Sequence, residues 1–269
     1  MFFAASVADQ QEGSDNLSTV EHYKTLLHFA RKMLQGDLVG GRGEEYIRAQ
    51  EHYAHVVNDE VSNFLSLRNK KILDVGGLSG VFCRVFSEEF GAQIAVNSEP
   101  YHEYYKNLHW PNRVRGAAQA LPFSDNQFDF VMCREVLEHI HPQYLQSAVS
   151  EMYRVTRNGG LCYISIPPWY NPVSGHALMP FHYLPFGTAK RLSLLFFRNP
   201  PINPSARSYA ELPLFKITYK PMMRLISSCG FRVLATKDHH FRLHFLTKIP
   251  LIRDVAVPCI VFIARKPEG

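Results

Sequence analysis

A glycine-rich turn that follows a short apolar stretch is the segment of this sequence best suited to holding a ligand. Residues 71–75 read Lys-Ile-Leu-Asp-Val, and glycines follow at positions 76, 77 and 80. Glycine lets the backbone come close to a ligand, and a helix start offers N–H groups that have no partner within the helix. Apolar residues recur with a helical period after position 80, so the pattern predicts a buried strand, a tight turn and a helix. Such turns also occur as plain connections, so the assignment depends on further motifs.

Polar residues also follow the next predicted strand, at residues 93–97. A carboxylate at the end of such a strand can accept hydrogen bonds from both hydroxyls of a ribose. Glu99 is the preferred candidate for this role, and Asn97 is the alternative because the alignment can shift by two residues. Pro100 favours a helix start, so Glu99 could instead be a first-turn acid that the helix dipole stabilises.

Two acids and a histidine follow the strand predicted at residues 128–133. Glu135, Glu138 and His139 have the spacing i, i+3, i+4 and could share one helix face. Two carboxylates and an imidazole are plausible ligands for a divalent metal ion. One helical turn without further acids nearby makes a poor magnesium site, so we expect no metal here. In the alternative interpretation, Glu138 and His139 only pack and hydrogen-bond at the start of a helix.

Histidines in a proline- and aromatic-rich segment, residues 169–217, are candidates for proton transfer. His176 and His182 lie in this segment, and Tyr183 follows. An imidazole can take a proton from a hydroxyl because its pKa lies near neutrality. His139 is a third candidate base, and Tyr183 would be a donor that positions a substrate. Each histidine could also have a purely structural role.

The composition is that of an ordinary globular protein. The chain has 269 residues, of which 46% are hydrophobic and 20% charged, and its net charge is +5. The basic residues do not form a stripe, so we expect no nucleic-acid ligand, whereas an acidic ligand or a membrane surface is permitted. No apolar run approaches the roughly 20 residues of a membrane helix, and residues 1–5 lack the basic start of a signal peptide.

Five cysteines, an odd number, are spread widely along the chain at positions 83, 133, 162, 229 and 259. No CxxC pair suggests a structural zinc site, and four of the cysteines lie in predicted apolar strands or helices. We therefore expect reduced core residues in a cytoplasmic protein.

Strand and helix patterns alternate along most of the chain. Strands are predicted at residues 71–75, 93–97, 113–117, 128–133, 161–166, 231–236 and 255–264. Helical patterns separate most of them, which indicates a doubly wound, parallel sheet of the α/β class. The last two strands lack a helix of normal length between them and are expected to form a closing antiparallel hairpin.

We expect a disordered segment, residues 1–16, followed by a single domain, residues 17–269. The domain would comprise an N-terminal helical cap (17–69, with helices at 18–34 and 44–67), a cofactor-binding core (70–168), a substrate lid after the fifth strand (169–217) and a final helix with the hairpin (218–269). Within the lid, residues 189–198 combine an apolar run with Lys190, Arg191 and Arg198. That pattern is typical either of a helix on a membrane surface or of the buried side of a lid.

Four ordered motifs resemble those of the class I S-adenosylmethionine-dependent methyltransferases. They read LDVGGLSG (73–80), AVNSEP (95–100), AAQALPFSDNQFDFVMCREVLEHI (117–140) and VTRNGGLCYISIP (155–167). The string EVLEH is similar to the ubiquinone/menaquinone-type O-methyltransferases, in which these acids and the histidine bind a metal. The GH…HY pattern of the lid is similar to a group of largely uncharacterised bacterial class I methyltransferases. The resemblance implies a Rossmann-like sheet of seven strands, mostly parallel, with the last strand antiparallel.

The resemblance also implies which residues bind the cofactor. They are Asp74, Gly76, Gly77 and Gly80 at its amino-acid end, Asn97 or Glu99 at the ribose, Ala118 and Gln119 at the adenine, and Cys133 at the rim that faces the methyl group. Two positions depart from the family pattern. Leu78 replaces the middle glycine, and Ala117 to Gln119 stand where an acid often pairs with the adenine amine.

The implied activity is methyl transfer from S-adenosylmethionine to an acceptor oxygen, with carbon and nitrogen as less favoured acceptor atoms. The acceptor would be a small molecule, a lipid or a glycan, and an amphiphilic acceptor is included. The sequence does not indicate the oligomeric state. Catalysis would come chiefly from holding the nucleophile, methyl carbon and sulfur in line. The alternative is a non-catalytic binding or scaffold protein with this fold, which Leu78 and the missing adenine acid favour.

Overall fold

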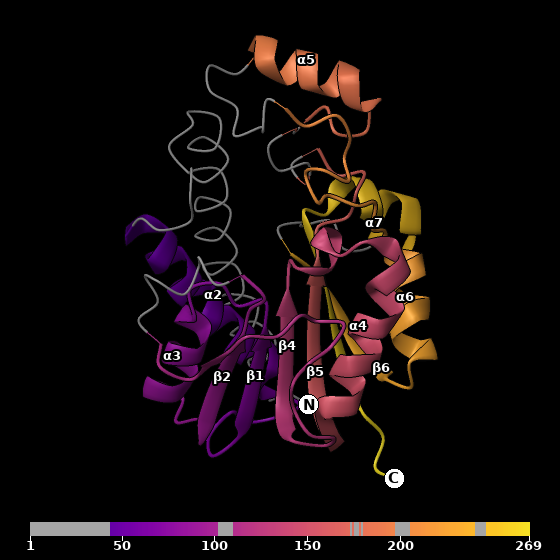
Figure 1. Ribbon diagram of the computed structural model, residues 1–269. Helices are drawn as coiled ribbons and strands as arrows, with labels where there is room; N and C mark the ends of the chain where they lie inside the picture. The colour runs from indigo at the N-terminus through magenta and orange to yellow at the C-terminus, as the bar shows by residue number, and fades with distance from the viewer. Residues whose placement is uncertain are drawn as a thin grey trace, which may run out of the picture.

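Seven strands form one mixed sheet in the order β3-β2-β1-β4-β5-β7-β6 (Figure 1). Their bounds are β1 (Lys71–Val75), β2 (Ile94–Ser98), β3 (Arg113–Val114), β4 (Phe128–Arg134), β5 (Thr156–Ile166), β6 (Arg232–His239) and β7 (Cys259–Arg265). The first five strands run parallel, and β7 is antiparallel to both of its neighbours. The predicted α/β sheet with an antiparallel last strand is confirmed.

The structure is a computed structural model that describes residues 44–101, 110–172, 174, 178, 180–196, 205–239 and 246–269. The predictions for residues 1–43, for the helix after Pro100 and for His176 lie outside these residues.

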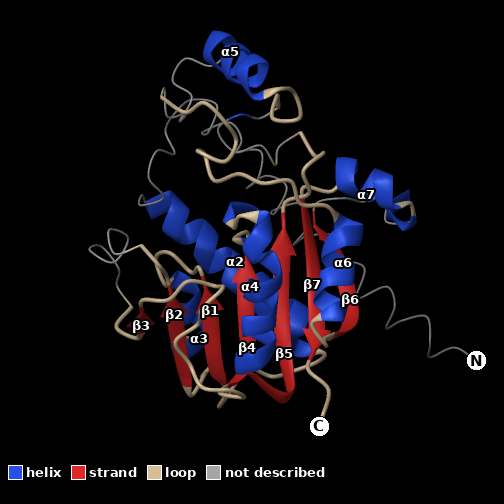
Figure 2. Ribbon diagram, turned by 45° about the vertical axis from the view of Figure 1, so that its right-hand side comes forward, coloured by secondary structure: helices blue, strands red, loops and turns tan. Residues whose placement is uncertain are grey.

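Helices cover both faces of the sheet (Figure 2). The described helices are α2 (Glu44–Ser62), α3 (Val81–Glu88), α4 (Pro142–Val155), α5 (Phe186–Phe196), α6 (Tyr219–Ser228) and α7 (Pro250–Ala256), with short 3-10 helices η2 (Leu137–His139) and η4 (Leu246–Lys248). α2 and α3 pack on one face, and α4 and α6 pack on the other. Burial on both faces explains why β1, β4 and β7 read as nearly continuous apolar runs.

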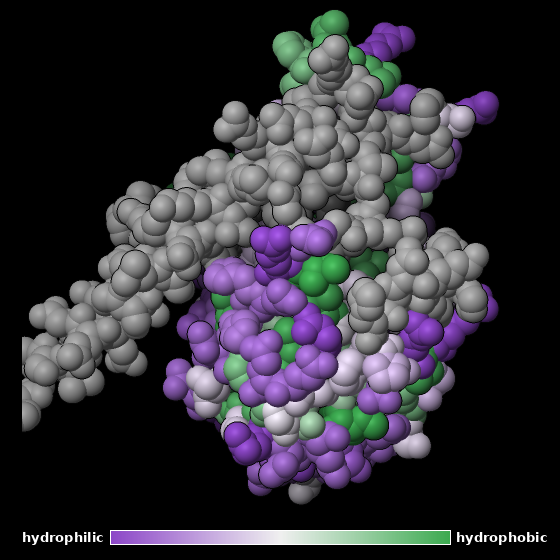
Figure 3. All heavy atoms as spheres, turned by 90° about the vertical axis from the view of Figure 1, so that its left-hand side faces the viewer, coloured by the Kyte–Doolittle hydropathy of each residue, from purple (hydrophilic) through white to green (hydrophobic). Residues whose placement is uncertain are grey.

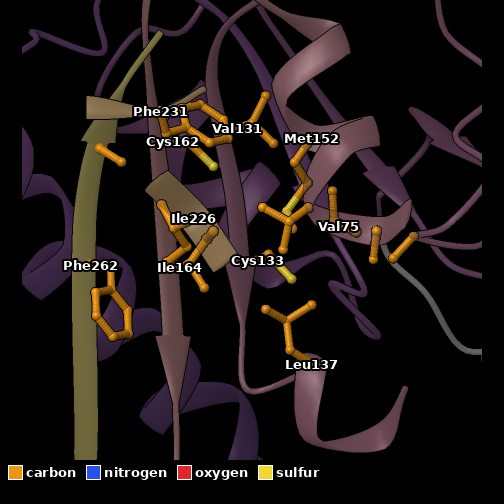
Figure 4. Packing of buried hydrophobic residues seen from close by; sticks show 14 of the residues in the cluster. Val75, Val131, Cys133, Leu137, Met152, Cys162, Ile164, Ile226, Phe231 and Phe262 are labelled. Atoms are coloured by element: carbon orange, nitrogen blue, oxygen red, sulfur yellow. The ribbon is translucent and has the colours of Figure 1, made fainter. Parts of the chain in front are cut away.

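Alternate side chains of each strand enter two separate cores. In β1, Ile72 packs on the face of α2 and α3, whereas Leu73 and Val75 pack on the face of α4 and α6. Figure 4 shows the second core, in which Cys133 of β4 lies near Leu137. Cys83, Cys133, Cys162 and Cys259 are buried, Cys229 is half-buried, and none forms a disulfide within the described residues.

Several predicted boundaries are wrong for local reasons. The helix predicted at 44–67 ends at Ser62, and β3 is shorter than the predicted strand. β5 begins at Thr156, before the predicted start, because the backbone of Thr156 pairs with Phe128 despite its polar neighbours. The start of the strand predicted at 255–264 belongs to α7, whose first residue, Pro250, has the fixed φ that suits a helix start.

The strand order reverses between β1 and β4. In open parallel sheets, ligands bind beyond the carboxyl ends of the strands at such a reversal. The glycine turn after β1 and the acidic segment after β4 therefore meet at the edge where a ligand is expected.

Candidate functional site

The turn between β1 and α3 requires its glycines. Gly76 and Gly80 have φ angles of 75° and 69°, a left-handed conformation that glycine adopts without strain. Gly80 is the N-cap of α3, and a Cβ atom there would lie 2.8 Å from Cβ of Trp110. A Cβ atom on Gly76 would lie 2.5 Å from Cγ2 of Val136, which follows β4. The turn is thus held closely between the two neighbouring segments.

Asp74 and Asn97 lie side by side beneath this turn. They are register partners on β1 and β2, and both side chains are buried. A Cβ atom on Gly77 would lie 2.1 Å from Oδ2 of Asp74 and 2.8 Å from Oδ1 of Asn97, so only glycine fits. Nδ2 of Asn97 donates a hydrogen bond of 3.1 Å to the carbonyl of Leu78. Within the described residues, those two side-chain oxygens accept no hydrogen bond.

Burial raises the pKa values of two carboxyl groups near the turn, those of Asp74 and Glu99. Removal from water raises the pKa of Asp74 to about 7, although the nearby Arg134 guanidinium opposes the shift. Burial also raises the pKa of Glu99, against hydrogen bonds from the backbone N–H groups of Tyr101 and Leu78. The carboxyl group of Glu99 therefore faces the turn, and the site suits a ligand that carries positive charge.

Leu78 does not fill the space beneath the turn. Its φ angle is 39°, so it takes a left-handed conformation at some cost, and the residue is 39% exposed. The preceding residue, Gly77, is the one whose backbone lies against the side chains of Asp74 and Asn97.

The remaining predicted cofactor residues lie in a tight turn after β3 and in the core. Ala118 is buried and Gln119 half-buried in a tight turn, in which the N–H of Ala120 donates to the carbonyl of Ala117. The thiol of Cys133 packs in the core of Figure 4, and burial raises its pKa well above the ordinary value.

Arg134, at the end of β4, joins the sheet edge to α2. Its guanidinium is within 3.3 Å of Oε1 of Gln50, within 3.2 Å of Oε1 of Glu135, and 4.2 Å from the ring centroid of Tyr53. Burial raises the pKa of Tyr53 to about 12. No sequence pattern predicted this cluster, and its one signal in the sequence is an arginine beside an acid at a strand end.

The prediction that the two acids and the histidine after β4 could share one helix face is wrong. Glu135 precedes η2 and has a φ angle of 52°, which turns the chain out of the strand. Glu138 is buried, and desolvation, followed by the charge of Glu135, raises its pKa well above the ordinary value. No group of three or more His, Cys, Asp or Glu side chains that could hold a metal ion occurs among the described residues.

The segment that we expected to form a lid, residues 169–217, is hydrogen-bonded to η2. The backbone N–H of Phe215 donates a 2.8 Å hydrogen bond to the carbonyl of Glu138, and Nδ1 of His139 lies 2.7 Å from the carbonyl oxygen of Pro213. Nε2 of His139 lies 3.9 Å from Oε1 of Glu138. His139 is exposed, and its contact with Pro213 places it where η2 meets residues 169–217.

The described lid candidates differ in their surroundings. His182 is fully buried, and its Nε2 lies 2.6 Å from the carbonyl oxygen of Trp169, whose ring it meets edge-on. Burial lowers its pKa, against the effect of that hydrogen bond. Tyr183 is exposed.

Comparisons with known proteins identify similar methyltransferases. A family model described as "Methyltransferase domain" matches residues 73–164. An uncharacterized methyltransferase of Mycolicibacterium gilvum is 30% identical over 206 residues, which cover 74% of this chain and 78% of the relative. One of Mycobacteroides abscessus is 29% identical over 221 residues, which cover 78% and 83%.

Solved structures share the fold at low sequence identity. An S-adenosylmethionine-dependent methyltransferase from Mesorhizobium loti has a TM-score of 0.54 and 12% identity, and covers 77% of this chain and 96% of its own. The [4+2]-cyclase SpnF also has a TM-score of 0.54, with 15% identity and 86% of each chain covered. Because these neighbours differ in reaction, they establish the fold alone.

The residues at the sheet edge fit S-adenosylmethionine. This cofactor carries a cationic sulfonium, a cationic ammonium and two ribose hydroxyls. The buried oxygens of Asp74 and Asn97 lack hydrogen-bond donors within the described part of the chain, and the carboxyl group of Glu99 faces the same turn. Together with the relatives that it matches over most of their length, these features show that the chain belongs to the class I S-adenosylmethionine-dependent methyltransferases.

Proposed function

We propose that this enzyme methylates an oxygen of a small-molecule, lipid or glycan acceptor and that His139 takes up the proton of the acceptor hydroxyl. The observation that carries the proposal is the position of His139 between the sheet edge and the lid, where η2 and Pro213 meet. His139 is exposed at this junction and so can meet an acceptor, whereas His182 is fully buried.

The hydrogen bond at Nδ1 supports a basic Nε2. The carbonyl oxygen of Pro213 can only accept, so Nδ1 of His139 carries the hydrogen and Nε2 carries the lone pair in the neutral ring. Uptake of a proton at Nε2 creates a positive charge 3.9 Å from the carboxyl group of Glu138. Ionisation of Glu138 would then stabilise that charge, which suits proton removal from an alcohol.

The other predicted residues receive supporting roles in this proposal. The cofactor, when bound, supplies an electrophilic methyl group on sulfur. The backbone of the glycine turn would hold its amino-acid end, with Asp74 beneath, and Glu99 would accept from the ribose, with Asn97 as the alternative. Ala118 and Gln119 would line the adenine side, and holding the reacting atoms in line under the lid would supply most of the rate.

Within the lid, we assign His182 to positioning. Its burial and its contact with the Trp169 carbonyl support a role in holding the start of the lid. Tyr183 is exposed and can donate to an acceptor, whereas His176 lies outside the described residues.

The test uses methyl-labelled S-adenosylmethionine with pools of alcohols, phenols, lipids and glycans, followed by mass spectrometry of the labelled products. We expect methyl ethers or esters as products. His139→Ala should lower kcat by roughly 10²- to 10⁴-fold, the usual contribution of a general base, with little change in cofactor Kd. His141→Asn, two residues away, is the matched control because asparagine preserves the N-cap of α4. Products methylated only on carbon or nitrogen, or full activity of His139→Ala, would contradict the proposal.

A further inference from the structure

α7 turns its polar side chains toward the protein and its apolar side chains toward solvent. Nε of Arg253 lies 3.0 Å from Oδ1 of Asp238 on β6, and the guanidinium lies 4.2 Å from the ring centroid of Tyr219. Asp254 accepts a 2.7 Å hydrogen bond from the backbone N–H of Tyr219. Leu251, in contrast, is 68% exposed. The exposed large apolar residues of this segment are Ile249, Leu251 and Val255. A surface helix normally has the opposite arrangement.

α5 likewise exposes its large apolar side chains. Its buried residues are the small Ala189 and Ser193, one turn apart. Leu195 is 76% exposed, and its neighbours Leu194 and Phe196 are also exposed. Burial of a large apolar side chain contributes roughly 1.5–3 kcal/mol of free energy. Several such side chains exposed on one short helix therefore indicate a surface that binds another apolar surface.

Among the described residues, the exposed charged side chains of α5, η4 and α7 are Arg191 and Lys248, and both are basic. Residues 186–210 contain Lys190, Arg191, Arg198 and Arg207 without an acid, and residues 239–253 contain Arg242, Lys248 and Arg253 without an acid. Arg191 and Lys248 are exposed, whereas the one acid of α7, Asp254, is buried. Apolar side chains bordered by cations are complementary to the acyl boundary of a membrane with anionic headgroups.

Both helices lie beyond the carboxyl ends of the strands, the edge that carries the glycine turn and His139 (Figures 1 and 2). Figure 3 shows hydrophobic residues gathered at the end of the molecule where α5 lies, beside hydrophilic ones. We propose that a docking face, made of Leu194, Leu195, Phe196, Ile249, Leu251 and Val255, binds the surface of an anionic membrane. This inference goes beyond the proposed function, because it concerns where the enzyme works and not the acceptor atom.

Two observations favour a membrane over a protein partner or a second copy. A two-fold contact between copies would bring the same cations, such as Arg191 and Lys248, toward one another, and like charges repel. The apolar residues also project from two separate short helices and not from one groove, an arrangement suited to shallow insertion. None of the described helices is long and apolar enough to cross a bilayer.

Flotation of the full-length protein with vesicles tests the docking face. We expect it to float with vesicles of phosphatidylcholine and phosphatidylglycerol, to bind pure phosphatidylcholine more weakly, and to be released by salt. Leu195→Ser and Leu251→Ser should each weaken partitioning roughly ten-fold. Ile94→Ser, which removes an exposed apolar side chain at the amino end of β2, is the matched control and should bind as wild type.

A charge pair of variants completes the test. Arg191→Glu should weaken binding to the anionic vesicles, whereas Arg224→Glu, exposed on α6, should not. A thermal shift with S-adenosylmethionine checks that each variant is folded. The inference is overturned if the wild type does not float, or if Leu195→Ser and Leu251→Ser float as well as the wild type. A concentration-dependent dimer that both variants abolish would assign the face to a second copy. Either failure leaves the methyl-transfer assay unaffected.

Discussion

At the scale of single residues, the site depends on one close contact between a backbone and a carboxyl group. The motif 73–80 predicted glycines where the backbone comes close to other groups, and in the structure the backbone of Gly77 lies against the side chain of Asp74. Even a methyl group at position 77 would therefore disturb the turn. Position 78, where the family motif usually has its central glycine, carries a leucine in this chain.

Gly77→Ala should lower the free energy of unfolding by about 1–3 kcal/mol, the usual cost of overpacking a filled site. The added Cβ would lie 2.1 Å from Oδ2 of Asp74, so the turn must move. Urea unfolding measures the loss, and calorimetric titration should show weaker binding of S-adenosylmethionine. Gly187→Ala is the matched control, because a Cβ there meets no atom within 4 Å. Equal stability of Gly77→Ala and wild type would show that the turn has room for a side chain.

At the scale of elements, the sequence predicted what depends on local apolar patterns. The strands β1 and β4 are apolar runs, and their parallel direction followed from alternation with helices, whereas the strand order comes from the structure. α7 was missed because polar contacts such as Arg253 to Asp238 dock it, while its apolar residues face solvent. The contact of His139 with Pro213 joins residues 74 positions apart, which no local pattern reveals.

Arg134 links two such distant elements, and its loss should loosen α2. Arg134→Met keeps an apolar stem but removes the contacts with Gln50, Glu135 and Tyr53. We expect a loss of about 1–3 kcal/mol, because the half-buried side chains of Gln50 and Glu135 lose a hydrogen-bond donor. Hydrogen exchange of the backbone amides of α2 should be faster in Arg134→Met than in the wild type. Arg48→Met removes an exposed ion pair on the same helix and should change little. Unchanged exchange in Arg134→Met would mean that apolar packing alone holds α2.

At the scale of the whole molecule, the buried carboxyl groups of the site lower the stability of the enzyme when no cofactor is bound. Asp74 and Glu99 are removed from water, and burial raises both pKa values. A cationic ligand offsets that cost when it binds, so cofactor affinity, stability and proton release are linked through the same carboxyl groups.

The pH dependence of Asp74 gives this linkage a definite sign. Its folded pKa of about 7 exceeds the ordinary value of 3.8, so the folded state binds more protons between those pH values. The contribution of Asp74 to stability therefore falls as the pH rises from about 4 to about 7, by an upper bound of about 4 kcal/mol, and is constant above. Asp74→Asn should remove this slope from the apo enzyme, whereas Asp59→Asn, an exposed acid on α2, should retain it. Cofactor binding should tighten over the same pH range in the wild type, because the sulfonium and ammonium favour the carboxylate, and should lose that dependence in Asp74→Asn. Denaturant unfolding and calorimetry at several pH values measure both effects, and identical slopes in wild type and Asp74→Asn would place the titrating group elsewhere.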